Sequence, residues 1–503
     1  MARQPTTPWP TTPGSVFFGD AASDATLSRA TKDDRIRRLA RGLYSADLRT
    51  EPAELVARNR WKIVARLVPD ALVADRSAAE GGRPVGGVLT VVSNERKEDL
   101  TLPGLVIAPR TGPGPLDDDL GWAEGLRLSS DARTLVDNLA VSRGRGGRPA
   151  RTLSRAEVEG WVVRTAQRRP DGWLESLRAR ALEVCEELGI PGRADAVADI
   201  IGAAAGTRRA RAGAGRLLAA KAAGQEYDPD RVARFDELAA YLRAIPSEAD
   251  VPTELPGLAD ERETSLPFFE AYFSNFIEGT EFTVEEAEAI VESGEIPDER
   301  PEDAHDVLGT LEAVHDPDLR RATPGTVEEL FELLGRRHRL VMGGRPDKRP
   351  GQFKERSNQA GSYIFVAPAL VEGTLVEGFR RIADLPPGFA RAAYELFLIS
   401  EVHPYDDGNG RVARAAMCAQ LTDAGLARIV IPIVFRNEYQ TALRSLSREG
   451  RCDLYARTLA HAWRWTAAMP WRDRAAVDGY LVATNALVDS TDAERTGVRL
   501  GLP

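Results

Sequence analysis

Residues 403–414, HPYDDGNGRVAR, bring together several side chains that could act on a phosphate group. His403 carries an imidazole whose ordinary pKa, about 6.5, lets it accept a proton near neutral pH. Asp407 offers the hard oxygen ligand that a phosphate-bound Mg²⁺ prefers. Arg411 and Arg414 are three residues apart, so both can lean towards one polyphosphate if they lie on a helix. Together these side chains predict a nucleotidyl or phosphoryl transfer site.

The residues around this stretch predict that it is a loop between two helices. The preceding segment, ARAAYELFLISEV, is apolar on nearly every side, and the proline after His403 biases that histidine away from helical angles. The following segment, RVARAAMCAQLTDAG, contains good helix formers and ends at Gly425. Gly408 and Gly410 have no side chains that would keep an anion from the backbone. The N–H groups that begin the second helix are therefore available to phosphate.

The same twelve residues resemble the signature of the Fic family: a histidine, an aromatic residue two positions on, an acid, G-N-G-R and a second arginine. A lone histidine is more often structural and a lone G-x-G is weak evidence, but here they occur together at these spacings. The resemblance implies transfer of AMP from ATP to a Ser, Thr or Tyr hydroxyl of a protein, with loss of pyrophosphate. The sequence departs from the pattern at Tyr405, where the family more often has phenylalanine.

By this resemblance, each part of the loop has an expected role. His403 would be the general base and Asp407 the Mg²⁺ ligand. The expected nucleotide-binding residues are Gly408, Asn409, Gly410, Arg411 and Arg414. The two arginines would meet the β- and γ-phosphates. Tyr405 would anchor the loop in the core, and Asp406 has no assigned role.

A second stretch, SNFIEG at 274–279, could regulate the first. Fic proteins carry an autoinhibitory helix with the pattern S/T-x-x-x-E-G/N, which Ser274, Glu278 and Gly279 fit. The resemblance implies that Glu278 pairs with Arg414 and displaces the γ-phosphate, because a desolvated carboxylate and guanidinium bond strongly. The alternative is an ordinary solvated glutamate on a helix surface. The residues that follow, TVEE, predict a capping box that begins a new helix.

Between these two stretches, residues 351–375 occupy the place of the family's β-hairpin flap, which pairs with the backbone of the target protein. The expected pairing strand is Tyr363, Ile364, Phe365 and Val366. His338 fits a common position of the family and is expected to be structural.

Composition bounds the type of protein. The chain has 503 residues, 43% of them hydrophobic and 28% charged, which predicts a soluble protein of several domains. It shows no secretory or membrane-spanning segment, so we expect a cytoplasmic location and no membrane partner. Three scattered cysteines and five scattered histidines indicate neither disulfides nor a zinc site.

The predicted fold class is mainly α: a helical Fic-type bundle with a small β-hairpin flap, preceded by a helical domain and a small α+β domain. Five segments are expected: a flexible Thr/Pro-rich tail at 1–25, a winged-helix-like domain at 26–141, a helical linker domain at 142–255, the Fic catalytic domain with its inhibitory helix at 256–475, and a C-terminal tail at 476–503.

The N-terminal part supports a second hypothesis. DRIRRLARGLYSADL predicts a short basic helix from Asp34 to Gly42, and the region resembles winged-helix antitoxin domains of abortive-infection systems. The resemblance implies DNA binding or protein docking. DNA contact through 26–221 would use Arg35, Arg38 and Arg41, while basic runs such as Val141–Arg180 are equally compatible with solvated helix faces. The alternative function is therefore a DNA-binding transcriptional regulator, or an antitoxin-like protein, whose Fic domain senses nucleotide.

The first hypothesis is a Mg²⁺-dependent protein adenylyltransferase, autoinhibited by Glu278, that uses ATP and Mg²⁺. Its partner would be a protein with a hydroxyl side chain, or the chain itself by self-modification. The sequence leaves the target and the oligomeric state open, a homodimer included.

Overall fold

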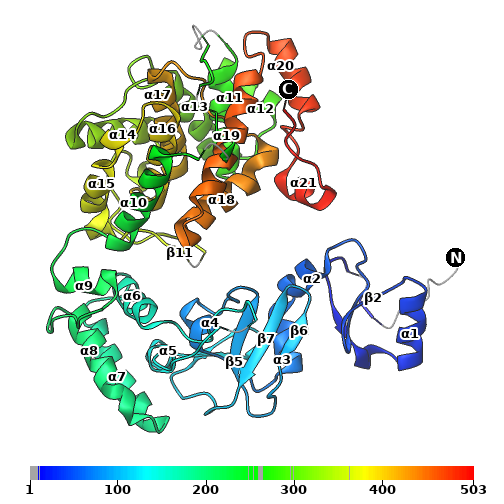
Figure 1. Ribbon diagram of the computed structural model, residues 1–503. Helices are drawn as coiled ribbons and strands as arrows, with labels where there is room; N and C mark the ends of the chain where they lie inside the picture. The colour runs from blue at the N-terminus through cyan, green and yellow to red at the C-terminus, as the bar shows by residue number, and fades with distance from the viewer. Residues whose placement is uncertain are drawn as a thin grey trace. The chain divides into compact units, whose positions relative to one another are not determined.

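A computed structural model describes residues 9–502 apart from 11, 145, 247–248, 253, 259–263, 295, 298 and 362. Parts of the two predicted tails and of the predicted helical linker domain at 142–255 therefore lie outside the described residues. The chain forms two compact units, unit 1 (Met1–Gly224) and unit 2 (Gln225–Pro503). Unit 2 is almost entirely helical and unit 1 combines helices with two small sheets, so the mainly α fold class is confirmed (Figure 1). None of the described helices is long and apolar enough to span a bilayer.

Unit 1 begins with a small antiparallel sheet of order β1-β3-β2, formed by β1 (Phe17–Phe18), β2 (Arg37–Ala40) and β3 (Leu43–Ser45), with helix α1 (Asp24–Lys32) before β2. The basic helix predicted from Asp34 to Gly42 is wrong. Gly42, at φ +75°, makes the turn between β2 and β3 instead of ending a helix. Strand β1 also lies within the segment predicted as a tail.

A six-stranded mixed sheet of order β6-β7-β5-β4-β9-β8 forms the centre of unit 1. It contains β4 (Leu72–Val73), β5 (Val88–Val92), β6 (Leu100–Leu102), β7 (Leu105–Arg110), β8 (Leu120–Gly121) and β9 (Arg127–Leu128). Strand β5 pairs in parallel with β7, and β6 and β7 form an antiparallel hairpin. Helices α2 (Pro52–Arg58), α3 (Arg60–Leu67), α4 (Asp75–Ala79) and α5 (Asp131–Asn138) accompany this sheet.

The rest of unit 1 is helical: α6 (Arg155–Ala166), α7 (Trp173–Glu187), α8 (Ala194–Ala204) and α9 (Arg216–Ala222). The next helix, α10 (Pro229–Arg243), belongs to unit 2, where the ring of Phe235 packs edge-on against Tyr394 and Phe397. Burial of these aromatic rings ties α10 to the core of the second unit.

Unit 2 is built around α16 (Phe389–Val402) and α17 (Asn409–Asp423), which pack side by side. Around them lie α11 (Leu266–Ile277), α12 (Val284–Ser293), α13 (Pro301–His315), α14 (Val327–Val341), α15 (Val371–Phe379), α18 (Arg436–Glu449) and α19 (Cys452–Ala468). Helix α12 begins with the predicted capping box, in which Thr283 and Glu286 bond each other's backbone N–H. Helix α16 is buried on nearly every side, as its apolar sequence predicted.

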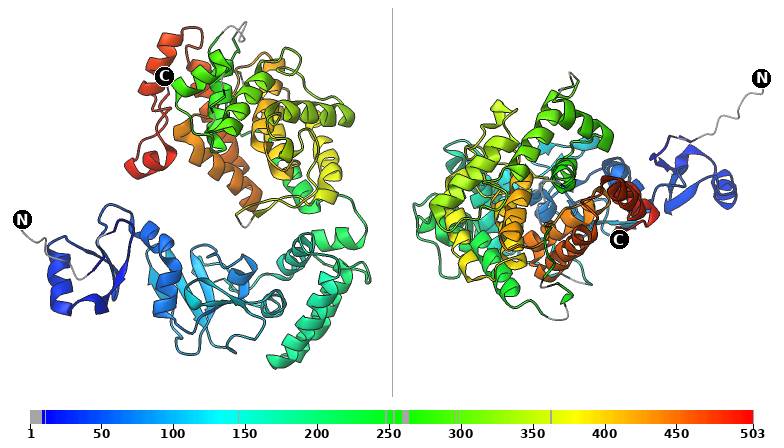
Figure 2. Two further views of the ribbon diagram at one scale, coloured as in Figure 1. Left: turned by 180° about the vertical axis from the view of Figure 1, so that it is seen from behind. Right: turned by 90° about the horizontal axis from the view of Figure 1, so that it is seen from above.

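Two segments of unit 2 differ from expectation. The sequence of residues 427–435, ARIVIPIVF, favours a strand, but no strand is formed there. Its backbone bonds to side chains instead: the Ala427 carbonyl accepts from the Trp463 indole, and the Val430 N–H donates to Thr466. Because these backbone groups are satisfied, no neighbouring strand is required. The predicted C-terminal tail contains helices α20 (Arg474–Ala483) and α21 (Ser490–Thr496), and α21 packs against α18 (Figure 2).

Candidate active site

The loop 403–408 joins α16 to α17, as its sequence predicted. His403 ends α16 in the left-handed region at φ +53°, and Gly408, at φ +72°, precedes the first turn of α17. The side chain of Asn409 bonds the loop itself, because its Oδ1 accepts from Tyr405 N–H at 2.8 Å and its Nδ2 donates to Tyr405 O at 2.9 Å. Asn409 thus fixes the loop's shape, and its contact with phosphate stays a prediction.

Tyr405 anchors the loop in the core. Its ring is fully buried and stacks on that of His338, with 3.7 Å between ring centroids. Nδ1 of His338 accepts a hydrogen bond from Gly351 N–H at 2.7 Å, so the proton resides on Nε2, which donates to the carbonyl of Asp407 at 3.1 Å. Burial lowers the pKa of His338 to about 4. This neutral histidine therefore holds the loop in place.

His403 is oriented to act as a base. Its Nδ1 lies 3.3 Å from the carbonyl of Ser400, which can only accept, so Nδ1 carries the proton and Nε2 keeps its lone pair. The ring of Phe365 stacks flat on the imidazole, with centroids 3.7 Å apart. Burial, and then the positive charge of Lys354, lower the pKa of His403 to about 4. The imidazole is therefore neutral at neutral pH.

Lys354 is a feature of the site that sequence reasoning missed. Its side chain is almost fully buried, and Nζ donates to Asn358 Oδ1 at 2.7 Å and to Val402 O at 3.4 Å. Asn358 in turn donates to the carbonyl of Tyr405 at 2.8 Å. Burial lowers the pKa of Lys354 to about 7. Its position before the flap, without any recognisable spacing to His403, gave no signal in the sequence.

Arg411 is buried and bonded to residues far away in the chain. Its Nη1 lies 2.5 Å from Oδ2 of Asp306, on α13, and 3.2 Å from Oδ1 of Asn275, on α11. Asp306 also accepts two hydrogen bonds from Arg345, at 3.0 and 2.7 Å. Asp306 therefore fixes the direction of Arg411. Neither Asp306 nor Arg345 was singled out from the sequence.

Arg414 contacts the SNFIEG stretch of α11. Its Nε donates to Ser274 Oγ at 2.9 Å, and its Nη2 donates to Ser274 O at 2.9 Å and to Glu278 Oε1 at 2.7 Å. Burial raises the pKa of the Glu278 carboxyl, but the guanidinium of Arg414 more than offsets this, and the resulting pKa lies below its ordinary value. Glu278 is therefore ionised at neutral pH, and Gly279 ends the turn at φ +100°.

Glu278 also lies over the start of α17. A methyl group placed on Gly410 would be only 2.1 Å from Glu278 Oε1 and 3.0 Å from Nη1 of Arg414. The carboxylate thus fills the space above the glycine at the helix N-terminus, where partial positive charge favours an anion. The structure therefore brings the start of α17 and the stretch 274–279 together, with the Glu278 carboxylate between them.

The donor set at Asp407 suits Mg²⁺ that arrives with phosphate. The Asp407 side chain is 43% exposed, and its Oδ1 accepts from Gly408 N–H at 2.7 Å, which leaves Oδ2 available. Within the described residues, no group of three or more acidic, histidine or cysteine side chains could hold a metal ion. One carboxylate completed by phosphate oxygens and water is the usual Mg²⁺ site beside a nucleotide.

The flap is a two-stranded antiparallel sheet of β10 (Gln359–Ala360) and β11 (Tyr363–Ile364). Arg231, on α10, holds it: Nη1 donates to the Tyr363 hydroxyl at 2.5 Å and Nη2 to the carbonyl of Ile364 at 2.7 Å. The Tyr363 hydroxyl also donates to Glu401, two residues before His403. One carbonyl of β11 is therefore already bonded, and the flap is tied to the end of α16. Of the other two predicted flap residues, Phe365 covers His403 and Val366 is buried.

Comparison with known proteins finds similarity to one family. Residues 330–421 match the model of the Fic/DOC family. Protein adenylyltransferase Fic of Nematostella vectensis is 26% identical over 272 residues, which cover 49% of this chain and 60% of that protein. The Drosophila erecta protein of the same name is 29% identical over 233 residues, 43% of each chain.

This chain thus spans about half the length of the curated relatives that it matches. The solved structure of Fic-1 from C. elegans aligns with a TM-score of 0.33 at 19% identity, over 65% of this chain and 93% of that one. The matched region, 330–421, contains the loop 403–408 and most of α17. The chain therefore carries a domain of the Fic/DOC family over these residues.

Proposed function

We propose that this protein transfers AMP from ATP to a hydroxyl side chain of a protein, and that Glu278 holds this activity low. The observation that carries the proposal is the carboxylate of Glu278, which bonds Arg414 while it lies over Gly410 at the N-terminus of α17. A carboxylate at a helix N-terminus that also meets a guanidinium occupies a place suited to phosphate. A terminal phosphate of ATP would compete with Glu278 for that place.

The chemistry assigned to His403 follows from its orientation. Nε2 accepts the proton of the target hydroxyl as the hydroxyl oxygen attacks the α-phosphorus of ATP. A bond forms between that oxygen and the α-phosphorus, and the bond from the α-phosphorus to the bridging oxygen of the β-phosphate breaks. Pyrophosphate leaves with the electron pair of that bond. The low pKa of His403 keeps Nε2 unprotonated, so the ring can accept a proton at neutral pH.

The remaining residues of the loop bind and orient. Arg411 and Arg414 offset the charge of the β- and γ-phosphates, and the N–H groups that begin α17 point at phosphate oxygens. Asp407 would hold Mg²⁺ through its free oxygen, and the ion would neutralise part of the triphosphate charge. The fixed shape of the loop, set by Asn409 and His338, keeps His403 and Arg414 in one geometry.

The flap is assigned to the target protein. An extended segment of the target would pair with the outer edge of β11, which brings its hydroxyl towards Nε2 of His403. Phe365, which stacks on His403, would border the entry of that hydroxyl. Self-modification by a serine, threonine or tyrosine of this chain is the same reaction with a different substrate.

The test compares nucleotide transfer by variants of the full chain. Incubation with [α-³²P]ATP and with [γ-³²P]ATP, in the presence of Mg²⁺ and cell extract, distinguishes AMP transfer from phosphate transfer. We expect Glu278→Gly to label protein from the α-phosphate alone, and mass spectrometry to locate AMP on a hydroxyl residue. The combined Glu278→Gly and His403→Ala variant should bind ATP but not label protein, since the base acts in the transition state.

A matched control is Glu281→Gly, which removes a carboxylate that is 62% exposed and lies three residues farther along. It should leave labelling at the level of the parent chain. If Glu278→Gly binds ATP and labels nothing, the proposed activity is wrong. If the parent chain and Glu278→Gly label protein equally, the proposed inhibition is wrong while the activity stands.

A further inference from the structure

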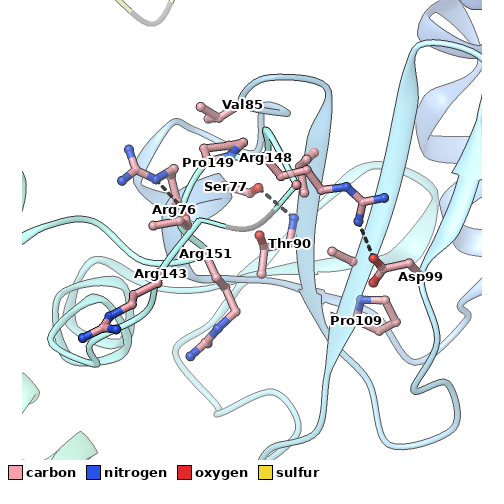
Figure 3. A pocket seen from close by; sticks show the side chains of 14 residues that line it. Arg76, Ser77, Val85, Thr90, Asp99, Pro109, Arg143, Arg148, Pro149 and Arg151 are labelled. Atoms are coloured by element: carbon pink, nitrogen blue, oxygen red, sulfur yellow. Dashed lines mark hydrogen bonds and ion pairs between the residues drawn. The ribbon is translucent and has the colours of Figure 1, made fainter.

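Two cavities in the described part of unit 1 are lined by arginines, and they differ in how their charges are paired. The first has a volume of about 490 Å³ and is lined by Arg76, Arg143, Arg148 and Arg151 (Figure 3). Three of these arginines have acidic partners: Arg76 pairs with Glu157, Arg148 with Asp99 and Arg151 with Asp75. Most of the positive charge around this cavity is therefore already balanced by the protein.

The second cavity has a volume of about 770 Å³ and is lined by α3, the glycine-rich loop 81–87, Gly104 and Trp122. Arg60 and Arg83 line it, and within the described part of the chain neither guanidinium has an acidic partner. Burial, and then the positive charge of Arg83, lower the pKa of Arg60. Two guanidiniums that repel each other, with no acidic side chain of the described residues paired to either, make this cavity favourable for a negatively charged ligand.

The same cavity presents aromatic surface. Trp61 and Trp122 meet edge to face with centroids 5.7 Å apart, and the Arg60 guanidinium lies 5.5 Å from the centre of the Trp61 ring. Among the described residues, the buried Nε1 of Trp122 has no hydrogen-bond acceptor. A buried N–H without an acceptor is unusual in a folded protein.

Glycines keep the backbone of this cavity close to the aromatic rings. A methyl group placed on Gly82 would lie 2.6 Å from Cζ2 of Trp122, and Gly82 has φ +80°. Neither that contact nor that backbone conformation suits a larger residue. Gly82 can therefore lie against Trp122, and a methyl group placed on Gly81 beside it would meet no atom within 4 Å.

We propose that this cavity binds a nucleotide unit, an aromatic base with its attached phosphate. The base would stack on indole and guanidinium planes, and the phosphate would pair with Arg60 and Arg83. The volume is within the range of small-ligand sites. A free nucleotide and one residue of a single strand share this chemistry. The site is in unit 1 and does not depend on the function proposed for unit 2.

The experiment measures binding of fluorescein-labelled octathymidylate to the full chain by anisotropy, at several salt concentrations. We expect the combined Arg60→Gln and Arg83→Gln variant to raise the Kd at least tenfold. The slope of log affinity against log salt should shrink by about 1.4, since each phosphate contact on a single strand contributes about 0.7. Arg58→Gln is the matched control, because Arg58 is exposed and pairs with Glu54 on α2. It should leave the Kd unchanged.

Competition identifies the source of the ligand. Displacement of the probe by AMP, at a concentration similar to that of unlabelled octathymidylate, would mean that the cavity takes free nucleotides. Affinity that rises with strand length would mean that it takes a single strand. Three results would overturn the proposal. The parent chain and the double variant could bind octathymidylate equally, the parent chain could bind neither octathymidylate nor AMP, or it could bind duplex more tightly than single strand. Arg83→Lys, which keeps the charge, should retain more affinity than Arg83→Gln.

Discussion

Glu278 and Arg414 are bonded at 2.7 Å across the start of α17, although they come from different helices. Ser274, one turn before Glu278, adds two further contacts to the same guanidinium. The end of α11 therefore holds Arg414 by three hydrogen bonds, and only one of them uses the Glu278 carboxylate, which we propose to be inhibitory. This division would allow the proposed inhibition to be weakened in steps.

Ser274→Ala should weaken the inhibition without abolishing it. The change removes the Oγ that accepts from Nε of Arg414, while the Ser274 carbonyl and Glu278 keep their bonds. Loss of one hydrogen bond to a charged group costs about 1.5–3 kcal/mol, so AMP transfer should rise by roughly ten- to a hundredfold and stay below that of Glu278→Gly. The rate of α-phosphate labelling measures this. Ser293→Ala on α12 is the control, and equal rates for parent and Ser274→Ala would contradict the prediction.

Gly410→Ala should abolish nucleotide binding. The added methyl group would lie 2.1 Å from Glu278 Oε1, so it displaces the carboxylate and at the same time covers the backbone that a phosphate would approach. We therefore expect no labelling by Gly410→Ala, either alone or combined with Glu278→Gly. Calorimetric titration with ATP checks this.

The control for this variant is Gly479→Ala, because a methyl group at that position on α20 meets no atom within 4 Å. It should bind ATP as the parent does. Full activity of the combined Gly410→Ala and Glu278→Gly variant would show that phosphate does not use the place above Gly410.

Asp306→Ala should destabilise unit 2. Asp306 is 2% exposed and bonds both Arg411 and Arg345, so its removal leaves buried guanidinium charge without its acid. Breaking a buried ion pair from one side costs about 3–5 kcal/mol of the free energy of unfolding. Denaturant unfolding of this variant and of Asp303→Ala, a 30% exposed neighbour, provides the comparison. A similar loss for both variants would contradict the prediction.

Acid should destabilise the protein through its buried histidines. His338 and His403 have pKa values lowered by burial to about 4, whereas an unfolded histidine has a pKa of about 6.5. Between these values the unfolded chain binds more protons, so the free energy of unfolding falls as the pH drops from about 6.5 to about 4. The slope is at most about 1.4 kcal/mol per pH unit for each histidine.

Thermal unfolding at several pH values tests this contribution. His338→Asn should remove about half of the histidine contribution to the pH dependence of unfolding. The stability of this variant at pH 7 is the reference for its stability at lower pH. His315→Asn is the control, since His315 is exposed on α13. The same pH slope in the parent and in His338→Asn would show that the histidine is not neutral in the fold.

Tyr363→Phe should loosen the flap. It removes the hydroxyl that accepts from Arg231 and donates to Glu401, while Ser447 still donates to Glu401 at 2.6 Å. We expect faster hydrogen exchange in β10 and β11 and a several-fold lower rate of transfer to protein in the Glu278→Gly background. The affinity for ATP should be unchanged. A loss of ATP affinity would place the effect in the loop 403–408 and not in the flap.

The sequence by itself was sufficient to predict the loop 403–408 and the two helices that it joins. The proline after His403, the glycines at 408 and 410, and the helix formers around them act over a few residues, so their effect on the backbone is local. The capping box at Thr283 and the apolar helix α16 were predictable for the same reason. The SNFIEG stretch could be matched to an inhibitory helix because its pattern also lies within one turn of chain.

The contacts between distant segments were decided only by the tertiary structure. Asp306 holds Arg411, Lys354 lies beside the end of α16, and Arg231 ties down the flap, yet none of these pairs has a fixed spacing in the chain. The N-terminal hairpin was missed because Gly42 can end a helix or make a turn, and the turn is seen only in the pairing of β3 with β2 and β1.

The role of Asn409 shows the same division. Its place in the motif follows from the sequence, but its side chain bonds Tyr405 because the folded loop brings that backbone within reach. Local spacing thus determined which chemical groups the loop contains. Packing determined which of these groups are bonded within the protein and which are left available to a ligand. Hydrogen bonds depend on distances of about 3 Å, and those distances are set by the whole fold.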